Sequence, residues 1–211
     1  MTSVGVIDYG VGNLRSVANA LRHVGAEPVV SDDADTLRAC ERIIFPGVGA
    51  FAYGKEALCA KGLHTVVLDA VASEKPLLAI CVGMQLMFER SSEFGDHEGL
   101  GIVSGRIEKF QTNPADTQPL RLPNVGWLPI RPSQEAEGLA GKLLEDVTAD
   151  SRFYFVHSYR AQSANPHAVA TSQYGGQSFA AAVGKGTMFA TQFHPEKSGP
   201  DGLKMLKKFV N

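Results

Sequence analysis

Leu77-Leu78-Ala79-Ile80-Cys81-Val82-Gly83-Met84-Gln85 is the stretch of sequence that decides the fold. Its apolar run, Pro76–Ile80, predicts a buried strand, and Met84–Glu89 favours a helix. A cysteine stands at the junction with a glycine two residues later, the layout of a nucleophile elbow at the carboxyl edge of a parallel sheet. The start of the helix favours the thiolate form of Cys81. The alternative is a buried structural cysteine, the usual fate of this residue type.

The segments before the elbow alternate between strand and helix signals. Strands are predicted at Ser3–Asp8, Glu27–Val30 and Arg42–Phe45, with helices after Asn13 and over Phe51–Ser73, the latter broken near Gly62. Continuous apolar strands separated by helices imply an α/β fold with a mostly parallel open sheet covered by helices on both faces.

The second half of the chain is richer in strand signals, which suggests antiparallel additions to the same sheet. We expect a closing helix with Leu203 and Leu206 on its buried side, and one domain over 1–211 with Gln111–Pro119 as its most loop-like stretch. The predicted strands are Gly101–Glu108, Val125–Ile130, Phe153–Val156, Ala168–Thr171, Phe179–Val183 and Met188–Phe193.

Composition excludes several classes of protein. The 211 residues are 44% hydrophobic and 20% charged with a net charge of −2, which fits neither a disordered chain nor a nucleic-acid-binding surface. No apolar run is long enough for a membrane span, and the start lacks a signal-peptide pattern, so we expect a cytoplasmic protein. Three cysteines without a C-x-x-C pair argue against a disulfide framework and a zinc site. We expect no metal and no cofactor, and assign no role to Cys40 or Cys59.

A thiolate nucleophile needs a base, and two of the six histidines follow predicted strands. In His194-Pro195-Glu196 the imidazole could carry the proton while the carboxylate orients it. His157 follows the strand Phe153–Val156 and is the rival base.

A glycine-rich turn follows the strand that ends at Phe45. In Pro46-Gly47-Val48-Gly49-Ala50, glycines on both sides of Val48 allow a backbone N–H to turn inward as an oxyanion-hole donor, with the Val82 N–H as a second. The alternative is a phosphate loop, but no G-K-[ST] follows. Tyr9–Asn13 does not complete G-x-G-x-x-G either, so nucleotide binding is not supported.

Two of these motifs, Cys81–Gln85 and His194-Pro195-Glu196, together resemble the class I (triad) glutamine amidotransferases. Further segments resemble one branch of that family, the glutaminase subunits of imidazole glycerol phosphate synthases of histidine biosynthesis. The resemblance runs in order from the first strand to the last helix, and these segments are Asp8–Leu14, Pro46–Phe51, Tyr154–Tyr159 and His194–Ser198.

The resemblance implies a role for each matching residue. His194 becomes the base and Glu196 its orienting carboxylate. Gln85 contacts the amino-acid end of glutamine, and Glu93 the amino group. The remaining pocket residues would be His157, Ser158 and Tyr159.

The resemblance also implies a partner, a separate (β/α)-barrel cyclase subunit that receives the ammonia. Near that interface we expect Asn13, Trp127, Tyr154 and Lys197, and a peptide flip around Val48 would switch on the glutaminase. The sequence departs from the family pattern at Ala79, usually glycine, and at Leu128, usually asparagine.

Three alternatives remain open at the level of sequence. One is the glutaminase of another class I amidotransferase, serving pyridoxal phosphate, anthranilate or GMP synthesis. The others are a non-enzymatic protein on the same scaffold and a cysteine peptidase of similar fold. Fold alone does not separate them.

Overall fold

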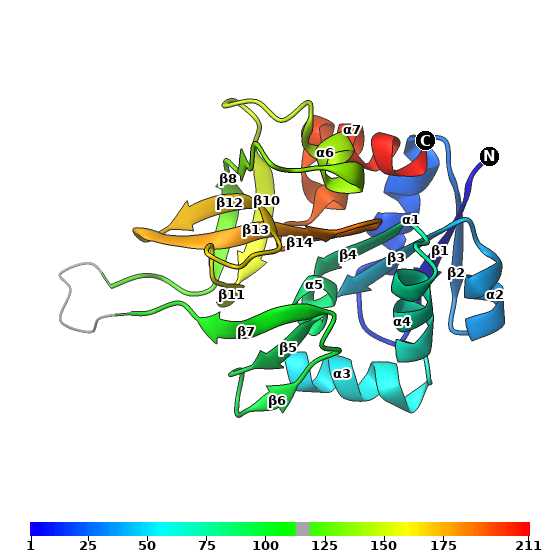
Figure 1. Ribbon diagram of the computed structural model, residues 1–211, viewed down its shortest axis with the longest axis horizontal. Helices are drawn as coiled ribbons and strands as arrows, with labels where there is room; N and C mark the ends of the chain where they lie inside the picture. The colour runs from blue at the N-terminus through cyan, green and yellow to red at the C-terminus, as the bar shows by residue number, and fades with distance from the viewer. Residues whose placement is uncertain (113–118) are drawn as a thin grey trace.

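A computed structural model describes residues 1–112 and 119–211, and its centre is an eight-stranded sheet (Figure 1). Five strands at one side run parallel in the order β2 (Glu27–Ser31), β1 (Ser3–Ile7), β3 (Arg42–Gly47), β4 (Leu77–Cys81) and β14 (Met188–Thr191). Three antiparallel strands extend it, namely β13 (Gln177–Lys185), β12 (Ala168–Tyr174) and β9 (Arg131–Pro132). The α/β prediction with a mostly parallel sheet is confirmed.

Helices cover both faces of this sheet, as Figure 1 shows. On one face lie α1 (Leu14–His23), α6 (Gly138–Leu144) and α7 (Gly199–Val210). On the other lie α3 (Phe51–Ala60), α4 (His64–Ala72) and α5 (Val82–Leu86), with α2 (Ala34–Ala39) packed against α4. Among the described residues, no helix combines the length and apolar character that crossing a bilayer requires.

The remaining strands correct the prediction for the second half of the chain. β7 (Val103–Lys109) lies in a four-stranded sheet with β5 (Phe88–Ser91), β6 (His97–Glu98) and β11 (Tyr159–Ala161). β8 (Asn124–Leu128) pairs only with β10 (Phe153–His157) among the strands of the described ranges. The strands predicted at Gly101–Glu108, Val125–Ile130 and Phe153–Val156 therefore exist, but they do not extend the main sheet. The strand predicted at Met188–Phe193 does belong to the main sheet, but its expected antiparallel direction is wrong, because β14 pairs parallel with β4. Of the predicted loop Gln111–Pro119, residues 113–118 lie outside the described part of the chain.

Three helices differ from the prediction, one in its extent and two because they were not predicted. The helix over Met84–Glu89 ends at Leu86, because Phe88 begins a strand that pairs with Val103 in β7. Helices α2 and α6 have six and seven residues, too short for an apolar period to be recognised in the sequence. The predicted break between α3 and α4 is present at Gly62, whose φ is +68°.

The sheet gathers four chain segments at one edge, where the parallel strands end. Tyr9 lies just beyond β1, Gly47 ends β3, Cys81 ends β4, and His194 follows β14. Gly47 and Cys81 are register partners in the β3–β4 ladder, so the glycine-rich turn and the elbow leave the sheet side by side. Residues far apart in sequence therefore share a single site.

Close backbone contact holds the elbow against β3. A Cβ atom on Gly83 would lie 2.1 Å from the Phe45 carbonyl oxygen, and one on Gly47 would lie 2.6 Å from the Gly83 nitrogen. Neither distance leaves room for a side chain, because a backbone atom cannot move aside as a flexible side chain can. Both positions therefore require glycine.

We expect Gly83→Ala to lower the free energy of unfolding by about 2 kcal/mol or more, since the methyl group must push α5 away from β3. Gly54→Ala is the matched control, because Gly54 lies in α3 and a Cβ atom at that position would have its nearest neighbours at 3.5 Å. That change should be neutral or stabilise the protein by about 1 kcal/mol. Urea unfolding of both variants tests the comparison, and equal losses of stability would contradict it.

Candidate active site

Cys81 occupies a strained position between β4 and α5. Its φ of +55° and ψ of −109° fall in a region that L-residues rarely adopt, and its side chain is almost fully buried. Val82, the first residue of α5, has a backbone N–H without a partner in the helix. The predicted strand, turn and helix around the cysteine are therefore present.

His194 and Glu196 form a buried pair beside Cys81, where the 3-10 helix η1 (Pro195–Lys197) follows β14. The Nδ1 of His194 lies 2.8 Å from the Oε1 of Glu196, and the two side chains are 2% and 1% exposed. Nδ1–H donates to the carboxylate, which fixes the ring. Nε2 is buried and has no hydrogen bond to another described residue. This nitrogen is therefore free to exchange a proton with a group in the adjoining cavity.

The surroundings of His194 favour its charged form. Burial alone lowers the pKa of an imidazole, but the negative charge of the Cys81 thiolate, together with the hydrogen bond to Glu196, raises the pKa of His194 to about 10. An imidazolium at neutral pH can neutralise a thiolate and later release its proton.

His157 differs from His194 in its contacts and in its protonation state. Its Nδ1–H donates to the Tyr159 carbonyl at 2.8 Å, and its Nε2 accepts from the Asn124 side-chain amide at 3.0 Å. Burial lowers the pKa of His157 to about 4, so the ring is neutral at pH 7. Both ring nitrogens are engaged, which leaves His157 no site to act as the base. The position of each histidine after a strand left both open as the base, the family resemblance favoured His194, and these contacts also favour His194.

A cavity of about 160 Å³ opens beside the cysteine, and every residue predicted for the oxyanion hole and for substrate binding lines it. Glu196 lies behind His194 and does not reach the wall. The lining residues are Val48, Gly49, Cys81, Val82, Gln85, Glu93, Val156, His157, Ser158, Tyr159 and His194.

Gln85 presents one unused acceptor near this cavity. Its Nε2 donates to the Tyr159 carbonyl at 3.2 Å and to the Gln192 Oε1 at 3.0 Å. Both amide hydrogens are therefore used, while Oε1 has no donor among the described residues. An acceptor in this position suits a substrate ammonium group.

Glu93 connects the cavity to the glycine-rich turn. Its Oε2 accepts the backbone N–H of Phe51, the first residue of α3, at 2.6 Å. Ala50, the residue before α3, has no side chain that could cap this helix, so Glu93 supplies the missing acceptor. The same turn is held at its other end by the Tyr9 hydroxyl, which donates to the Pro46 carbonyl at 2.9 Å. Gly49 between them has a φ of +87°.

The residues predicted for the partner interface only partly come together. Trp127 is half exposed and packs its ring edge-on at 5.9 Å against Tyr154, over which the Lys197 ammonium lies at 5.9 Å. Asn13 instead accepts the Ser16 N–H at 3.4 Å as the cap of α1. Leu128, where the sequence departs from asparagine, is partly buried and packs against the core.

Sequence reasoning missed Gln192 and Asn124. Gln192 lies two residues before His194, is fully buried, and donates its Nε2–H to the Cys81 sulfur at 3.7 Å. Asn124 holds His157 from β8, across the β8–β10 ladder. Neither residue stands in a local pattern that indicates its contacts.

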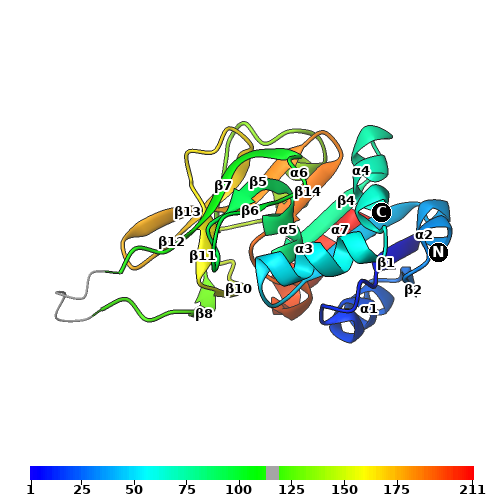
Figure 2. The same ribbon diagram turned by 90° about the horizontal axis from the view of Figure 1, so that it is seen from below.

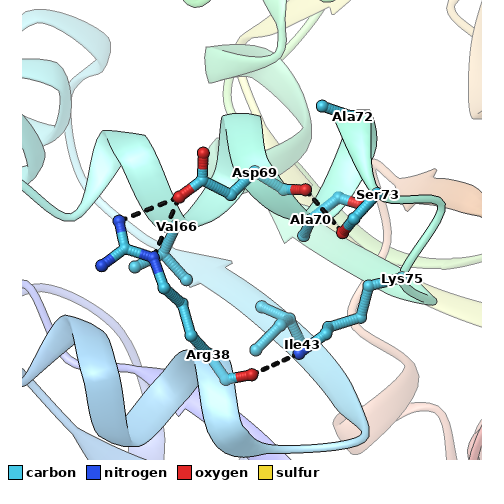
Figure 3. Close-up of a pocket in the computed structure, with 8 residues that line it drawn as sticks. All are labelled: Arg38, Ile43, Val66, Asp69, Ala70, Ala72, Ser73 and Lys75. Carbon is cyan, nitrogen blue, oxygen red and sulfur yellow. Dashed lines mark hydrogen bonds and ion pairs between the residues drawn. The ribbon is translucent and has the colours of Figure 1, made fainter.

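A second, larger cavity of about 470 Å³ lies near the opposite end of β3, between Arg38 and Lys75 (Figure 3). Its charges already have partners, because Arg38 donates to Asp69 at 2.9 Å and Lys75 donates to the carbonyls of Arg38 and Cys40. Its described lining residues include no nucleophile with a base. Within 1–112 and 119–211, no three His, Cys, Asp or Glu side chains gather as a metal site.

Comparisons with known proteins give matches that extend over nearly the whole chain. A family model described as "Glutamine amidotransferase class-I" matches residues 5–211. The chain is 44% identical over 215 residues to "Imidazole glycerol phosphate synthase subunit HisH" of Methylococcus capsulatus, covering 100% of this chain and 96% of that one. It is 37% identical over 211 residues to "Imidazole glycerol phosphate synthase subunit HisH 1" of Legionella pneumophila, covering 100% and 99%. The solved structure of PurLQS from Thermotoga maritima has a similar fold, with a TM-score of 0.73 at 21% identity, covering 100% and 98%.

Proposed function

The chain belongs to the class I glutamine amidotransferase family, and on that premise we propose that it is the glutaminase subunit of an imidazole glycerol phosphate synthase. Its role is to hydrolyse glutamine and to supply the ammonia to a cyclase subunit in histidine biosynthesis. The observation that carries the proposal is the meeting of Cys81, His194 and Glu196 beside one cavity. Residues 1–211 act as one domain, in the cytoplasm, where cysteines stay reduced.

In the first half of the reaction, the Cys81 thiolate attacks the side-chain amide carbon of glutamine. The negative charge moves to the amide oxygen, which the N–H groups of Val82 and the Val48–Gly49 turn stabilise. The carbon–nitrogen bond then breaks while the His194 imidazolium gives its proton to the nitrogen. Ammonia leaves, and a glutamyl thioester remains on Cys81 with His194 neutral.

In the second half, His194 takes a proton from water as the oxygen attacks the thioester carbon. The carbon–sulfur bond breaks, glutamate leaves, and the thiolate–imidazolium pair is restored. Throughout, Glu196 keeps Nδ1 protonated and so leaves Nε2 to exchange the proton. At the other end of the substrate, Glu93 and the Oε1 of Gln85 bind its ammonium group. His157, Ser158 and Tyr159 form the facing wall.

The proposed docking face for the cyclase subunit is the cluster formed by the exposed Val125 and Trp127 and the half-buried Tyr154 and Lys197. Val125 and Trp127 are 56% and 51% exposed and point outward on the same side of β8. Exposed aromatic residues beside a cation are typical of the energetic centres of interfaces. The cluster adjoins the active site, since the Tyr154 carbonyl accepts the His194 backbone N–H at 2.9 Å. A partner docked here would receive ammonia before water protonates it.

The chain alone should hydrolyse glutamine negligibly. Addition of a cyclase subunit should give low hydrolysis, and addition of that subunit with its nucleotide substrate should give strong hydrolysis. Cys81→Ala should abolish all three, because no other group can form the thioester. Glutamate production measures each activity. Cyclisation driven by added ammonia should survive the change, since it does not use this site.

The matched control for that experiment is Cys59→Ala, which removes an exposed thiol on α3 and should leave hydrolysis unchanged. Glutamine hydrolysis that persists in Cys81→Ala would show that another residue is the nucleophile.

Trp127→Ala should weaken binding to the cyclase subunit roughly tenfold or more, because a half-exposed tryptophan at the centre of an interface contributes strongly to affinity. Calorimetric titration of the two subunits measures the effect. Leu68→Ala is the control, since Leu68 is an exposed apolar residue of α4. In both views α4 lies well away from β8 (Figures 1 and 2). Equal affinities for Trp127→Ala and the unchanged chain would place the interface elsewhere.

A further inference from the structure

The Gln192 side chain is fully buried and lies between the nucleophile and a substrate-binding residue. Its Nε2–H donates to the Cys81 sulfur at 3.7 Å, and its Oε1 accepts from the Gln85 Nε2 at 3.0 Å. We propose that Gln192 is a positioning residue for Cys81, whose N–H holds the thiolate in place and stabilises its charge. This inference rests on the proposed function, in which Cys81 is the nucleophile.

The polarity of this hydrogen-bond chain is fixed at its far end. The Tyr159 carbonyl can only accept, so the group that Gln85 directs toward it must be the NH₂. The same NH₂ then donates to Gln192, which must present its oxygen to Gln85. The remaining end of the Gln192 amide, its NH₂, therefore faces the Cys81 sulfur. A backbone carbonyl in β11 thus determines which atom of Gln192 meets the nucleophile.

The backbone at Gln192 is held independently of its side chain. Its N–H donates to the Ala181 carbonyl in β13 at 2.9 Å, and the neighbouring Thr191 hydroxyl donates to the Phe193 carbonyl at 2.9 Å. An amide buried to this extent is costly unless both of its ends are bonded. Here both ends are bonded, so the donor is fixed before glutamine arrives and does not reorganise during the reaction.

Gln192 and His194 therefore act on Cys81 in different ways. His194 supplies a charge and a proton, whereas Gln192 supplies a neutral donor that cannot be transferred. Loss of the Gln192 donor should reduce the thiolate fraction and the turnover, while Gln85 keeps its hydrogen bond to the Tyr159 carbonyl. A purely structural role would loosen the pocket and change glutamine binding as well.

The test is the pH profile of Cys81 alkylation by iodoacetamide, followed by mass spectrometry of the Cys81 peptide. Gln192→Met keeps the length of the side chain but removes the donor, and Gln192→Glu places an oxygen where the donor was. Both should move the profile to higher pH and slow alkylation at pH 7 roughly tenfold or more, the loss expected for a hydrogen bond to a charged group. In the complex with the cyclase subunit, Gln192→Glu should lower kcat for glutamine with little change in KM, because it keeps an oxygen that accepts the Gln85 N–H.

Two controls separate this result from general damage. The exposed Cys59 in the same samples should keep its own profile. Ser172→Ala removes another buried hydrogen bond, to the Pro129 carbonyl at 2.8 Å, and should leave the Cys81 profile unchanged.

Two results would overturn the inference. One is a Cys81 profile in Gln192→Met and Gln192→Glu that matches the unchanged protein, and the other is an equal shift in Ser172→Ala. Because alkylation does not depend on glutamine, these outcomes are distinct from failure of the proposed function, which is hydrolysis that persists in Cys81→Ala.

Discussion

The positive φ at Cys81 is the constraint on which the rest of the site depends. An L-residue in this conformation costs of order 1–3 kcal/mol, so the surrounding structure must hold it there. Backbone contact between β3 and α5 does so, and it exists only because Gly47 and Gly83 carry no side chain. The strained turn directs Cys81 beyond the sheet edge, toward the turn after β3 and the segment after β14. The oxyanion donors and the base are therefore positioned by the same parallel ladder that positions the nucleophile.

The neighbours of the two buried histidines give them opposite protonation states. His194 lies between a carboxylate and a thiolate, and the two negative charges outweigh the cost of burying its own positive charge. His157 is equally enclosed but faces a carbonyl and an amide, and without a negative neighbour it stays neutral. Two rings at the same sheet edge thus have separate tasks, one for proton transfer and one for shaping the pocket wall. The neighbouring groups, rather than the depth of burial, decide which of the two histidines is protonated.

The sequence was sufficient for β1, β2, β3 and β4, because each contains a short apolar run that ends at a glycine or a polar residue. It assigned the strand at Met188–Phe193 to the antiparallel additions, whereas β14 pairs parallel with β4, and no local pattern shows the direction of a strand. It also placed Cys81, the Val48–Gly49 turn and His194 at one edge. The choice between His194 and His157 rested on the family resemblance alone, since the physical reason for it includes the contact of His157 with Asn124, which is distant in the chain and has no motif of its own. Gln192 was missed because nothing local shows which way a glutamine at the end of a strand points. The strand at Phe88 replaced a predicted helix because its partner in β7 lies outside any local window.

The raised pKa of His194 beside Cys81 is the central feature of the site, and an NMR titration of the His194 ring carbon Cε1 tests it most directly. A raised pKa keeps the imidazolium present to higher pH, so in the unchanged protein the ring should remain charged well above the ordinary midpoint of about 6.5. In Cys81→Ala the midpoint should fall, because Glu196 alone must then offset the cost of burial. A ring that is neutral at pH 7 in the unchanged protein, or a midpoint that is the same in both proteins, would contradict the account.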